Sequence, residues 1–342
     1  MSRAVTAVAG TNIALVKYWG KRDAALNLPA AGSLSLTLDR LGTRTTVAFD
    51  RVAGDGDRVT LNGAAADAKT AARVGAFLDR IRALAKLDAG ATVVSENSVP
   101  TAAGLASSAS GFAALALAAS RAAGLEPSPP ELSVLARLGS GSAARSIFGG
   151  FVEMAAGARA DGSDAFARPL ESAWDVRLVV AVTAAGEKTM GSTAAMEHTA
   201  RTSPYYEAWV RGVDGDLTAA RAAITARDLA ALGVVAERSA LRMHAAAMTA
   251  DPAIIYWNPA TLAAVVRVRA LRAAGTPAFF TIDAGPHVKV LCAAADADAI
   301  AVALDDTLGV LRTIVAAPGP GARVIEETGC WARCCRRPES CS

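Results

Sequence analysis

The first third of the chain alternates apolar and polar positions, whereas the second half repeats apolar positions at helical spacing. Period-two and β-branched runs predict strands over residues 4–8, 34–39, 44–49, 58–61 and 91–95. A helix is expected over residues 66–87, because its apolar residues recur every three to four positions and charged residues take the opposite side. This part of the chain should form a sheet covered by an amphipathic helix.

Two more strands are predicted, at residues 151–155 and 176–183, before helical patterns take over. A polar loop is expected at 186–196, followed by a helix with Ser203 as N-cap and Pro204 at its first position. The remaining elements are helices over residues 229–248, 259–274 and 296–304 and strands over residues 278–282, 288–292 and 313–316. The pattern predicts an α+β fold with a first lobe over residues 1–185, a second over 186–325 and an appended tail over 326–342.

Two loops rich in small residues and hydroxyl groups precede predicted helices. The first, Asn97 to Gly111, contains no acidic residue, so its backbone N–H groups and hydroxyls could converge on a phosphate at the start of the following helix. It has neither a Walker ending nor a Gly-x-Gly-x-x-Gly, and alone it is equally consistent with a flexible linker. The second, Leu138 to Ser146, adds the guanidinium of Arg145, which suits bidentate recognition of phosphate or carboxylate. Two such loops argue against the linker interpretation.

Composition limits the classes of ligand and location. The chain has 342 residues, of which 52% are hydrophobic and 20% charged, enough for a large core in one or two domains. Its 35 basic and 32 acidic residues are interspersed and give a net charge of +3, so the sequence shows no basic stripe for nucleic acid. The N-terminal pattern is not that of a signal peptide, charged residues interrupt the alanine-rich runs, and a cytoplasmic protein is expected. An anionic ligand should therefore be small and locally bound.

Cysteine is concentrated at the end of the chain. Cys292 stands apart from the other four, which are Cys330, Cys334, Cys335 and Cys341. A zinc or redox centre is the functional interpretation, but the spacing matches no usual zinc pattern. The position of the four residues after a Pro-Gly-Pro-Gly break favours a disordered tail.

Three charged residues stand next to apolar segments. Asp283 follows the run Ala-Phe-Phe-Thr-Ile and precedes the tight turn Ala-Gly-Pro, so it could act as a base or a metal ligand; a strand-capping Asx turn is the structural alternative. Lys17 and Lys21 flank Tyr18 and Trp19, which indicates a lined pocket more than two isolated surface charges. The three histidines form no metalloprotease motif and no hydrolase triad.

Four motifs occur in a specific order along the chain. They are Asn-Ile-Ala-Leu-Val-Lys-Tyr-Trp-Gly-Lys-Arg-Asp from Asn12, Pro-Thr-Ala-Ala-Gly-Leu-Ala-Ser-Ser-Ala-Ser-Gly from Pro100, Gly-Ser-Gly-Ser-Ala-Ala-Arg-Ser from Gly139, and Ile-Asp-Ala-Gly-Pro from Ile282. Together they resemble the motifs of the diphosphomevalonate decarboxylases, a family of the GHMP kinase superfamily. The similarity runs from about residue 5 to about residue 325.

The resemblance implies a two-lobed α+β GHMP kinase fold. The N-terminal lobe would be of the ribosomal protein S5 domain 2-like type, the C-terminal lobe an α/β-sandwich, and the active site would lie in the cleft between them. It also implies ATP and Mg2+, mevalonate 5-diphosphate as the small-molecule substrate, and a cytoplasmic homodimer with no nucleic-acid or membrane partner. The tertiary 3-hydroxyl would be phosphorylated first, because hydroxide is a poor leaving group, and loss of phosphate and CO2 would then give isopentenyl diphosphate.

The resemblance assigns roles to individual residues. Asp283 would lie close to the 3-hydroxyl, Lys17 would hold Asp283 ionised and offset phosphoryl charge, and Arg145 would clamp the substrate carboxylate. The substrate, chiefly its diphosphate, would be bound by Tyr18, Lys21, Ser140, Ser142, Ser192 and Ala284. ATP would be bound by Asn97, Ala103, Gly104, Leu105, Ala106, Ser107, Ser108, Ser110 and Lys188, with Ser107 also a metal ligand.

Some positions depart from the family pattern. Asn97-Ser-Val-Pro stands where Asn-Asn-Phe-Pro is usual, Ala144 where Cys is common, and His287 where Asn is common. None of these removes a proposed catalytic group, but Ser98, Val99 and His287 bear on nucleotide affinity and pH dependence. The alternatives are a phosphomevalonate decarboxylase, a mevalonate 3-kinase and a non-catalytic nucleotide-binding paralogue. Retention of all three catalytic residues favours decarboxylation.

Overall fold

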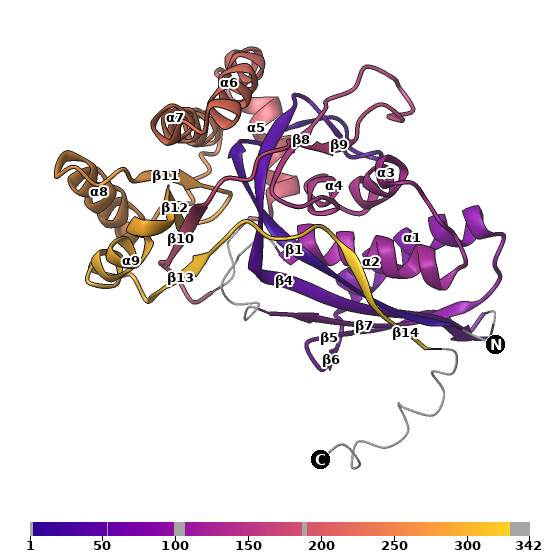
Figure 1. Cartoon of the computed structure of the whole chain (residues 1–342). Helices are drawn as coiled ribbons and strands as arrows, with labels where there is room; N and C mark the ends of the chain where they lie inside the picture. The colour runs from indigo at the N-terminus through magenta and orange to yellow at the C-terminus, as the bar shows by residue number, and fades with distance from the viewer. Residues whose placement is uncertain (1–2, 53, 99–106, 187–189, 329–342) are drawn as a thin grey trace, which may run out of the picture.

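The chain forms two β-sheets with helices packed on them, in two lobes (Figure 1). The computed structural model describes residues 3–52, 54–98, 107–186 and 190–328. The predicted two-lobed α+β architecture is confirmed.

The first sheet has the strand order β14-β1-β4-β7-β5-β6, and β8 and β9 extend it from β4. Its strands are β1 (Ala4–Val16), β4 (Ser33–Arg51), β5 (Arg58–Leu61), β6 (Ala64–Ala65), β7 (Gly90–Asn97), β8 (Phe151–Met154), β9 (Ala167–Pro169) and β14 (Arg323–Thr328). Its helices are α1 (Ala68–Ala85), α2 (Ser107–Ala122), α3 (Pro129–Gly139) and α4 (Ala143–Ser146) (Figure 1). The many buried alanines of α2 let this helix pack closely on β1 and β4.

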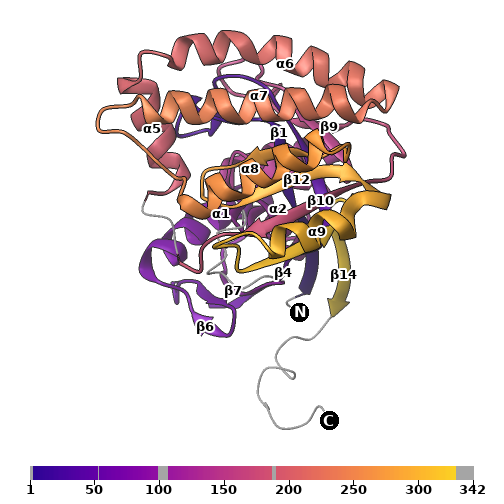
Figure 2. The same cartoon turned by 90° about the vertical axis from the view of Figure 1, so that its left-hand side faces the viewer.

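The second sheet has the order β11-β12-β10-β13 and lies between two helix layers (Figure 2). Its strands are β10 (Val176–Val182), β11 (Phe279–Ile282), β12 (Val288–Ala293) and β13 (Arg312–Ala316). One layer consists of α8 (Pro259–Ala273) and α9 (Ala297–Asp305), the other of α6 (Tyr206–Ala226) and α7 (Leu229–Met248). The remaining elements are α5 (Ser192–Thr202), β2 (Lys21–Asp23), β3 (Leu28–Pro29) and the 3-10 helix Ala294–Asp296. Within the described ranges, no helix has both the length and the apolar composition needed to cross a bilayer.

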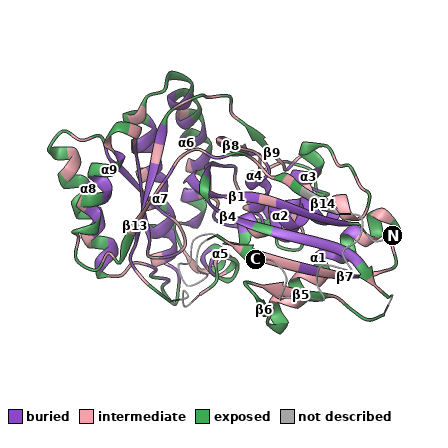
Figure 3. Ribbon diagram, turned by 60° about the horizontal axis from the view of Figure 1, so that its bottom comes forward, coloured by how far each residue is buried: buried purple, intermediate pink, exposed green. Residues whose placement is uncertain are grey.

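One hydrophobic cluster joins the two lobes. Ile13 of β1 and Leu36 of β4 belong to the same buried cluster as Leu178 of β10 and Leu232 of α7. Figure 3 shows β1 and β4 largely buried. The lobes are thus packed together along β1, which leads directly into Lys17.

The two strands predicted at residues 34–39 and 44–49 are one continuous strand, β4. In place of a turn, β4 has an irregularity: its pairing with β1 shifts register between Gly10–Gly42 and Asn12–Thr37, and the strand pairs with β1 on both sides of the shift. A Cβ atom at Gly42 would lie only 2.6 Å from the carbonyl oxygen of Ala9. Glycine therefore permits close backbone contact here and does not mark a chain reversal.

Two helix starts also differ from the prediction. α5 begins at Ser192, inside the segment predicted as a loop. α6 begins at Tyr206 and not at Pro204. The hydroxyl of Ser203, the predicted N-cap, accepts a hydrogen bond from the backbone N–H of Tyr205 at 3.3 Å and also pairs with the Thr249 hydroxyl at 2.9 Å.

Long-range strand pairing corrects the predicted lobe boundaries. β10 pairs with β12 and β13, so the second sheet starts before residue 185. β14 pairs with β1, so residues 323–328 return to the first sheet, and the predicted tail cannot start at residue 326. We propose that the lobes divide between β9 and β10. The rest of the predicted tail lies outside the described residues.

Candidate active site

Asp283 lies between two lysine side chains. It follows β11, and Ala284, a predicted substrate contact, comes next in the turn to β12. Lys17 Nζ donates to Asp283 Oδ1 at 2.6 Å, and Lys289 Nζ lies 3.1 Å from Oδ2. The side chains of Lys17 and Lys289 are 1% and 4% exposed, whereas that of Asp283 is 30% exposed. Each carboxylate oxygen therefore has its own countercharge, and part of the carboxylate stays accessible.

The end of β1 and two elements of the second lobe place Lys17. Its Nζ also donates to the carbonyl oxygen of Ala14 at 2.7 Å, and its backbone N–H donates to Ser239 Oγ of α7 at 3.0 Å. Thr281 Oγ1 of β11 donates to the same Ala14 carbonyl at 3.3 Å. The fold thus brings Lys17 and Asp283, which were predicted from separate motifs, together from the two lobes.

Lys289 is a site residue that the motifs did not predict. This residue lies on β12 between Val288 and Val290, paired across the sheet with Thr281 of β11. A buried ammonium group is costly unless it is paired, so a lysine inside an apolar strand is unusual. A lysine inside a segment already predicted as a strand was the feature of the sequence that could have identified it.

Burial and charge act in opposite directions on Asp283. Burial would raise its pKa, but the charges of Lys17 and Lys289 outweigh burial and hold the pKa well below its usual range. Burial lowers the pKa of Lys17 to about 8; Asp283 opposes this shift, whereas Lys289 and Arg145 add to it. Asp283 is therefore ionised at neutral pH, and Lys17 loses its proton as the pH rises through its pKa.

Arg145 is buried among uncharged partners. Its Nη1 donates to Ser33 Oγ at 2.6 Å, its Nε to Ser35 Oγ at 3.0 Å and its Nη2 to Asn12 Oδ1 at 3.1 Å. Burial lowers the pKa of Arg145 to about 10, which leaves the guanidinium charged at neutral pH. A buried cation held by neutral oxygens is suited to bind an anion.

The loop between α3 and α4 brings Ser140 and Ser142 beside Tyr18. The Tyr18 ring lies against Gly141, where an added Cβ atom would collide with its hydroxyl oxygen. The guanidinium carbon of Arg145 is 5.9 Å from the centre of the same ring. Burial raises the pKa of Tyr18, so its hydroxyl remains a neutral hydrogen-bonding group. Four of the predicted site residues are therefore gathered here.

Lys21 and α5 meet across the lobes. Lys21 Nζ lies 3.5 Å from Oγ1 of Thr193, the residue after Ser192. Arg73 of α1, which sequence analysis did not select, donates from Nη2 to the carbonyl oxygen of Gly139 at 2.7 Å. Burial lowers the pKa of Lys21; the charge of Glu197 opposes this shift and that of Arg73 adds to it. Arg73 therefore contacts the second small-residue loop, and Lys21 lies within range of its charge.

The first small-residue loop is described only at its ends. Thr43 Oγ1 donates to Asn97 Oδ1 at 2.8 Å and pairs with the Ser110 hydroxyl at 2.7 Å. In the first turn of α2, which has no acidic residue, Ser108 is exposed and Ser110 buried. The other predicted ATP contacts lie outside the described residues: Ala103, Gly104, Leu105, Ala106, Lys188 and the side chain of Ser107.

His287 ties the Asp283 turn to β10. Its Nδ1 accepts a hydrogen bond from the backbone N–H of Thr183 at 3.1 Å. Thr183 Oγ1 and Thr261 Oγ1 both donate to the carbonyl oxygen of Pro286, at 2.8 and 2.6 Å. The residue that departs from the family pattern thus supports the backbone that carries Asp283.

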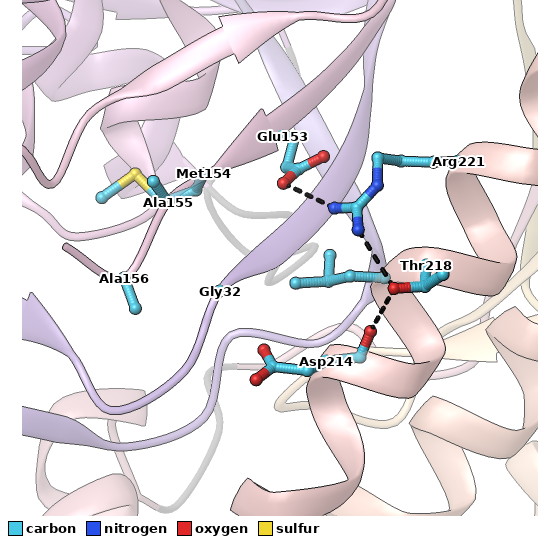
Figure 4. A pocket seen from close by; sticks show the side chains of 9 residues that line it. Gly32, Glu153, Met154, Ala155, Ala156, Asp214, Thr218 and Arg221 are labelled. Carbon is cyan, nitrogen blue, oxygen red and sulfur yellow. Dashed lines mark hydrogen bonds and ion pairs between the residues drawn. The ribbon is translucent and has the colours of Figure 1, made fainter.

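A separate pocket lies between β8 and α6 (Figure 4). It is lined by Gly32, Glu153, Met154, Ala155, Ala156, Asp214, Leu217, Thr218 and Arg221. Arg221 Nη1 pairs with Glu153 Oε1 at 3.0 Å, and its Nη2 donates to Thr218 Oγ1 at 3.1 Å. No predicted site residue lines this pocket, and its ion pair is already satisfied. The candidate active site is therefore the junction around Asp283.

Two family models match the chain. The diphosphomevalonate decarboxylase-like N-terminal domain matches residues 9–167, and the mevalonate 5-diphosphate decarboxylase C-terminal domain matches residues 178–317. A diphosphomevalonate decarboxylase of Aspergillus fumigatus is 39% identical over 324 residues, which cover 89% of this chain and 80% of the relative.

Solved structures are similar to the chain over nearly its whole length. The crystal structure of mevalonate diphosphate decarboxylase from Staphylococcus aureus has a TM-score of 0.91 and 39% identity, covering 95% of this chain and 99% of that one. The structure of MDDEF in complex with MVAPP, AMPPCP and magnesium has a TM-score of 0.89 and 42% identity, covering 94% of this chain and 99% of that one. Sequence and fold thus point to the same relatives.

Proposed function

The chain belongs to the diphosphomevalonate decarboxylase family, and we propose that it converts mevalonate 5-diphosphate and ATP to isopentenyl diphosphate, ADP, phosphate and CO2. The observation that carries the proposal is the Lys17–Asp283 pair, 2.6 Å apart at the junction of the lobes. Arg145, a buried cation with uncharged partners, belongs to the same electrostatic environment, because its charge lowers the pKa of Lys17. The junction therefore combines a carboxylate, an ammonium and a guanidinium.

We assign the phosphorylation step to Asp283 and Lys17. The substrate 3-hydroxyl would bind the accessible part of the Asp283 carboxylate, which orients its oxygen toward the phosphoryl donor. Because the pKa of Asp283 is held well below its usual range, this carboxylate is a weak base. Its main contribution is orientation and stabilisation of positive charge, while Lys17 offsets the negative charge of the phosphoryl group. As the bond to ADP breaks and the bond to the 3-oxygen forms, the hydroxyl proton would pass to an oxygen of the transferred phosphoryl group.

The decarboxylation step is assigned to Arg145. Its guanidinium would bind the substrate carboxylate and align the bond to be broken. Departure of the 3-phosphate builds positive charge at C3, close to Asp283. The electron pair of the bond between C2 and the carboxylate carbon then forms the C2–C3 double bond, and CO2 leaves.

The diphosphate of the substrate is proposed to bind the hydroxyls and cations around the second small-residue loop. These groups belong to Tyr18, Lys21, Arg73, Ser140, Ser142 and Ser192, with Ala284 as a backbone contact. Lys21 and Arg73 supply positive charge for the diphosphate.

ATP supplies the γ-phosphoryl group, and Mg2+ offsets its charge. Hydroxyls near the first loop and an α2 first turn without acidic residues suit phosphate oxygens. In the part of the chain that the structure describes, no group of three or more His, Cys, Asp or Glu side chains could hold a metal ion. We propose that Ser107 would be a protein ligand of Mg2+ and that phosphate oxygens of ATP would be further ligands. The similar MDDEF structure contains AMPPCP and magnesium.

The homodimer stays a prediction from the resemblance, and the cytoplasmic location a prediction from the N-terminal pattern and composition. Sedimentation equilibrium of the purified protein, with and without substrates, would measure the oligomeric state. A monomer at all concentrations would contradict the homodimer.

The purified protein should be incubated with ATP and Mg2+ and, separately, with mevalonate, its 5-phosphate and its 5-diphosphate. We expect ADP and CO2 in equal amounts from the diphosphate. ADP without CO2 would indicate a 3-kinase, and CO2 from the monophosphate alone would change the substrate. ATP binding without turnover of any of the three would indicate a non-catalytic paralogue.

A further inference from the structure

Lys289 is the part of the Asp283 centre that the proposed function does not use. Lys17 binds Asp283 Oδ1 at 2.6 Å, and Lys289 lies 3.1 Å from Oδ2, so the two ammonium groups take opposite oxygens of one carboxylate. Lys289 Nζ also donates to the carbonyl oxygen of His287 at 3.3 Å, which fixes it over the turn that carries Asp283. Its geometry is therefore specific.

Packing alone does not explain a lysine at this position. On β12, Val288, Val290 and Cys292 pack in the cluster that includes α8 and α9, while Leu291 packs in the cluster shared by the lobes. An apolar side chain at position 289 would suit these surroundings, and replacing a buried ionic group by an apolar one is often neutral or stabilising. The ion pair with Asp283 therefore accounts for the ammonium group at position 289.

Lys17 cannot serve Asp283 alone throughout the proposed reaction. When the ammonium group of Lys17 interacts with the transferring phosphoryl group, it compensates less of the negative charge of Asp283. At the same stage, anionic groups of both substrates lie near that carboxylate. A carboxylate surrounded by anions is driven to take up a proton or to rotate away. A second cation on the opposite oxygen prevents both.

We propose that Lys289 is a positioning residue that binds the second oxygen of Asp283, fixes the rotation of its carboxylate and keeps it ionised while Lys17 engages the phosphoryl group. This inference rests on the proposed function. It predicts that the two lysines differ in role: Lys17 acts on the substrate, and Lys289 acts through Asp283.

The pH dependence of activity reports this arrangement. The charged or titratable groups facing Asp283 are Lys17 just after β1, Lys289 on β12, Arg145 on α4 and His244 on α7. Burial lowers the pKa of His244 to about 3, so this ring is neutral wherever activity is measured. Removing the Lys289 charge should raise the pKa of Asp283, which loses a cation, and that of Lys17, which loses a like charge. Both limbs of the pH profile should therefore move to higher pH.

The test compares Lys289→Met, Lys289→Gln and Lys289→Arg in the full-length enzyme, with ATP, Mg2+ and mevalonate 5-diphosphate. Lys69→Met, on the exposed side of α1, is the matched control for loss of a lysine. We expect Lys289→Met to lower kcat by roughly tenfold, the effect of losing one electrostatic partner, with the KM for ATP little changed. Lys289→Arg should recover most of the activity. Lys289→Gln keeps a hydrogen-bond donor but no charge, so both limbs of its pH–activity profile should lie at higher pH than in the wild type.

A double-mutant cycle separates action through Asp283 from an independent effect. In the Asp283→Asn background, Lys289→Met should have less than about a twofold further effect, because residues that act as a unit are not additive. Full additivity would overturn the proposal. A lowered Tm with unshifted pH limbs would assign Lys289 a structural role only.

The two proposals fail differently. If wild-type enzyme releases CO2 but Lys289→Met has the wild-type kcat and pH limbs, the positioning role is wrong and the proposed function stands. If wild-type enzyme releases no CO2 from any mevalonate derivative, the proposed function fails and the positioning role with it. A 15N NMR titration of Lys17 Nζ needs no turnover: an unchanged pKa in Lys289→Met and Lys289→Gln would contradict the coupling.

Discussion

The Asp283 and Arg145 centres both lie at the junction of the lobes, yet they differ in how their charge is compensated. Asp283 has an ammonium group on each oxygen, at 2.6 and 3.1 Å. Arg145 is held by the hydroxyls of Ser33 and Ser35 and the amide oxygen of Asn12, none of which carries charge. Each oxygen of Asp283 thus has a cationic partner, whereas the hydrogen-bond partners of Arg145 within the described ranges are neutral.

This difference assigns the two centres to different tasks. A compensated carboxylate holds its protonation state and orientation when charged ligands arrive, which suits orientation of a hydroxyl and stabilisation of charge. An uncompensated guanidinium gains most from binding an anion, because the cost of burying it has already been met by the fold.

Asp283→Asn should lower turnover by roughly 10²-fold or more and leave ATP binding nearly intact, because the variant loses a positioned charged group but no proposed nucleotide contact. Steady-state kinetics and nucleotide titration measure the two effects. Asp298→Asn, in the exposed first turn of α9, is the matched control. Turnover within about tenfold of wild type would refute the role.

Arg145→Gln should lower kcat/KM for mevalonate 5-diphosphate by about 30-fold, since a hydrogen bond to a charged group contributes about 2 kcal/mol. If Arg145 acts on the carboxylate, more ADP than CO2 should be released, because phosphorylation continues without aligned decarboxylation. Arg211→Gln, where the arginine side chain is 71% exposed, is the control. If this variant releases less ADP and less CO2 but still in equal amounts, Arg145 and Asp283 cannot be assigned to separate steps.

Lys21→Met should raise the KM for mevalonate 5-diphosphate by about fivefold at low salt, because a partly exposed charge pair contributes up to about 1 kcal/mol. The effect should shrink as salt is added, and kcat should change little. Lys69→Met serves as the control. A salt-independent loss confined to kcat would contradict a role in diphosphate binding.

The basic limb of kcat/KM should have its midpoint near pH 8, because burial lowers the pKa of Lys17 to about 8 and the charged form is the active one. Activity should be present below this pH and fall as the pH rises through it. Lys17→Arg should move the limb to higher pH, since arginine stays protonated. A limb that does not move in this variant would mean that another group titrates.

The sequence predicted local elements well where local spacing decides them. The strand at residues 58–61 and the helix at 229–248 were predicted with the observed bounds. β14 was missed because its partner, β1, lies at the other end of the chain. The turn expected inside β4 is instead a shift in register, because β1 pairs with β4 on both sides of it.

In the candidate site, too, local motifs predicted some residues, and only long-range packing identified the others. The motifs identified Lys17 and Asp283, and the structure places them in contact. Ser33, Ser35 and Asn12 were not predicted as partners of Arg145, although two hydroxyls spaced by two residues on a strand must face the same side. Which face that is depends on the packing of β4.

By itself the sequence determined the order of strands and helices, the two small-residue loops and the residue types able to handle an anionic substrate. These depend on spacing, turn chemistry and side-chain charge, which are local properties. Tertiary structure alone decided that Lys289 shares Asp283 with Lys17, that neutral groups surround Arg145 and that β14 closes the first sheet. Such pairings depend on which distant segments pack together, and burial then sets how strongly each charge acts.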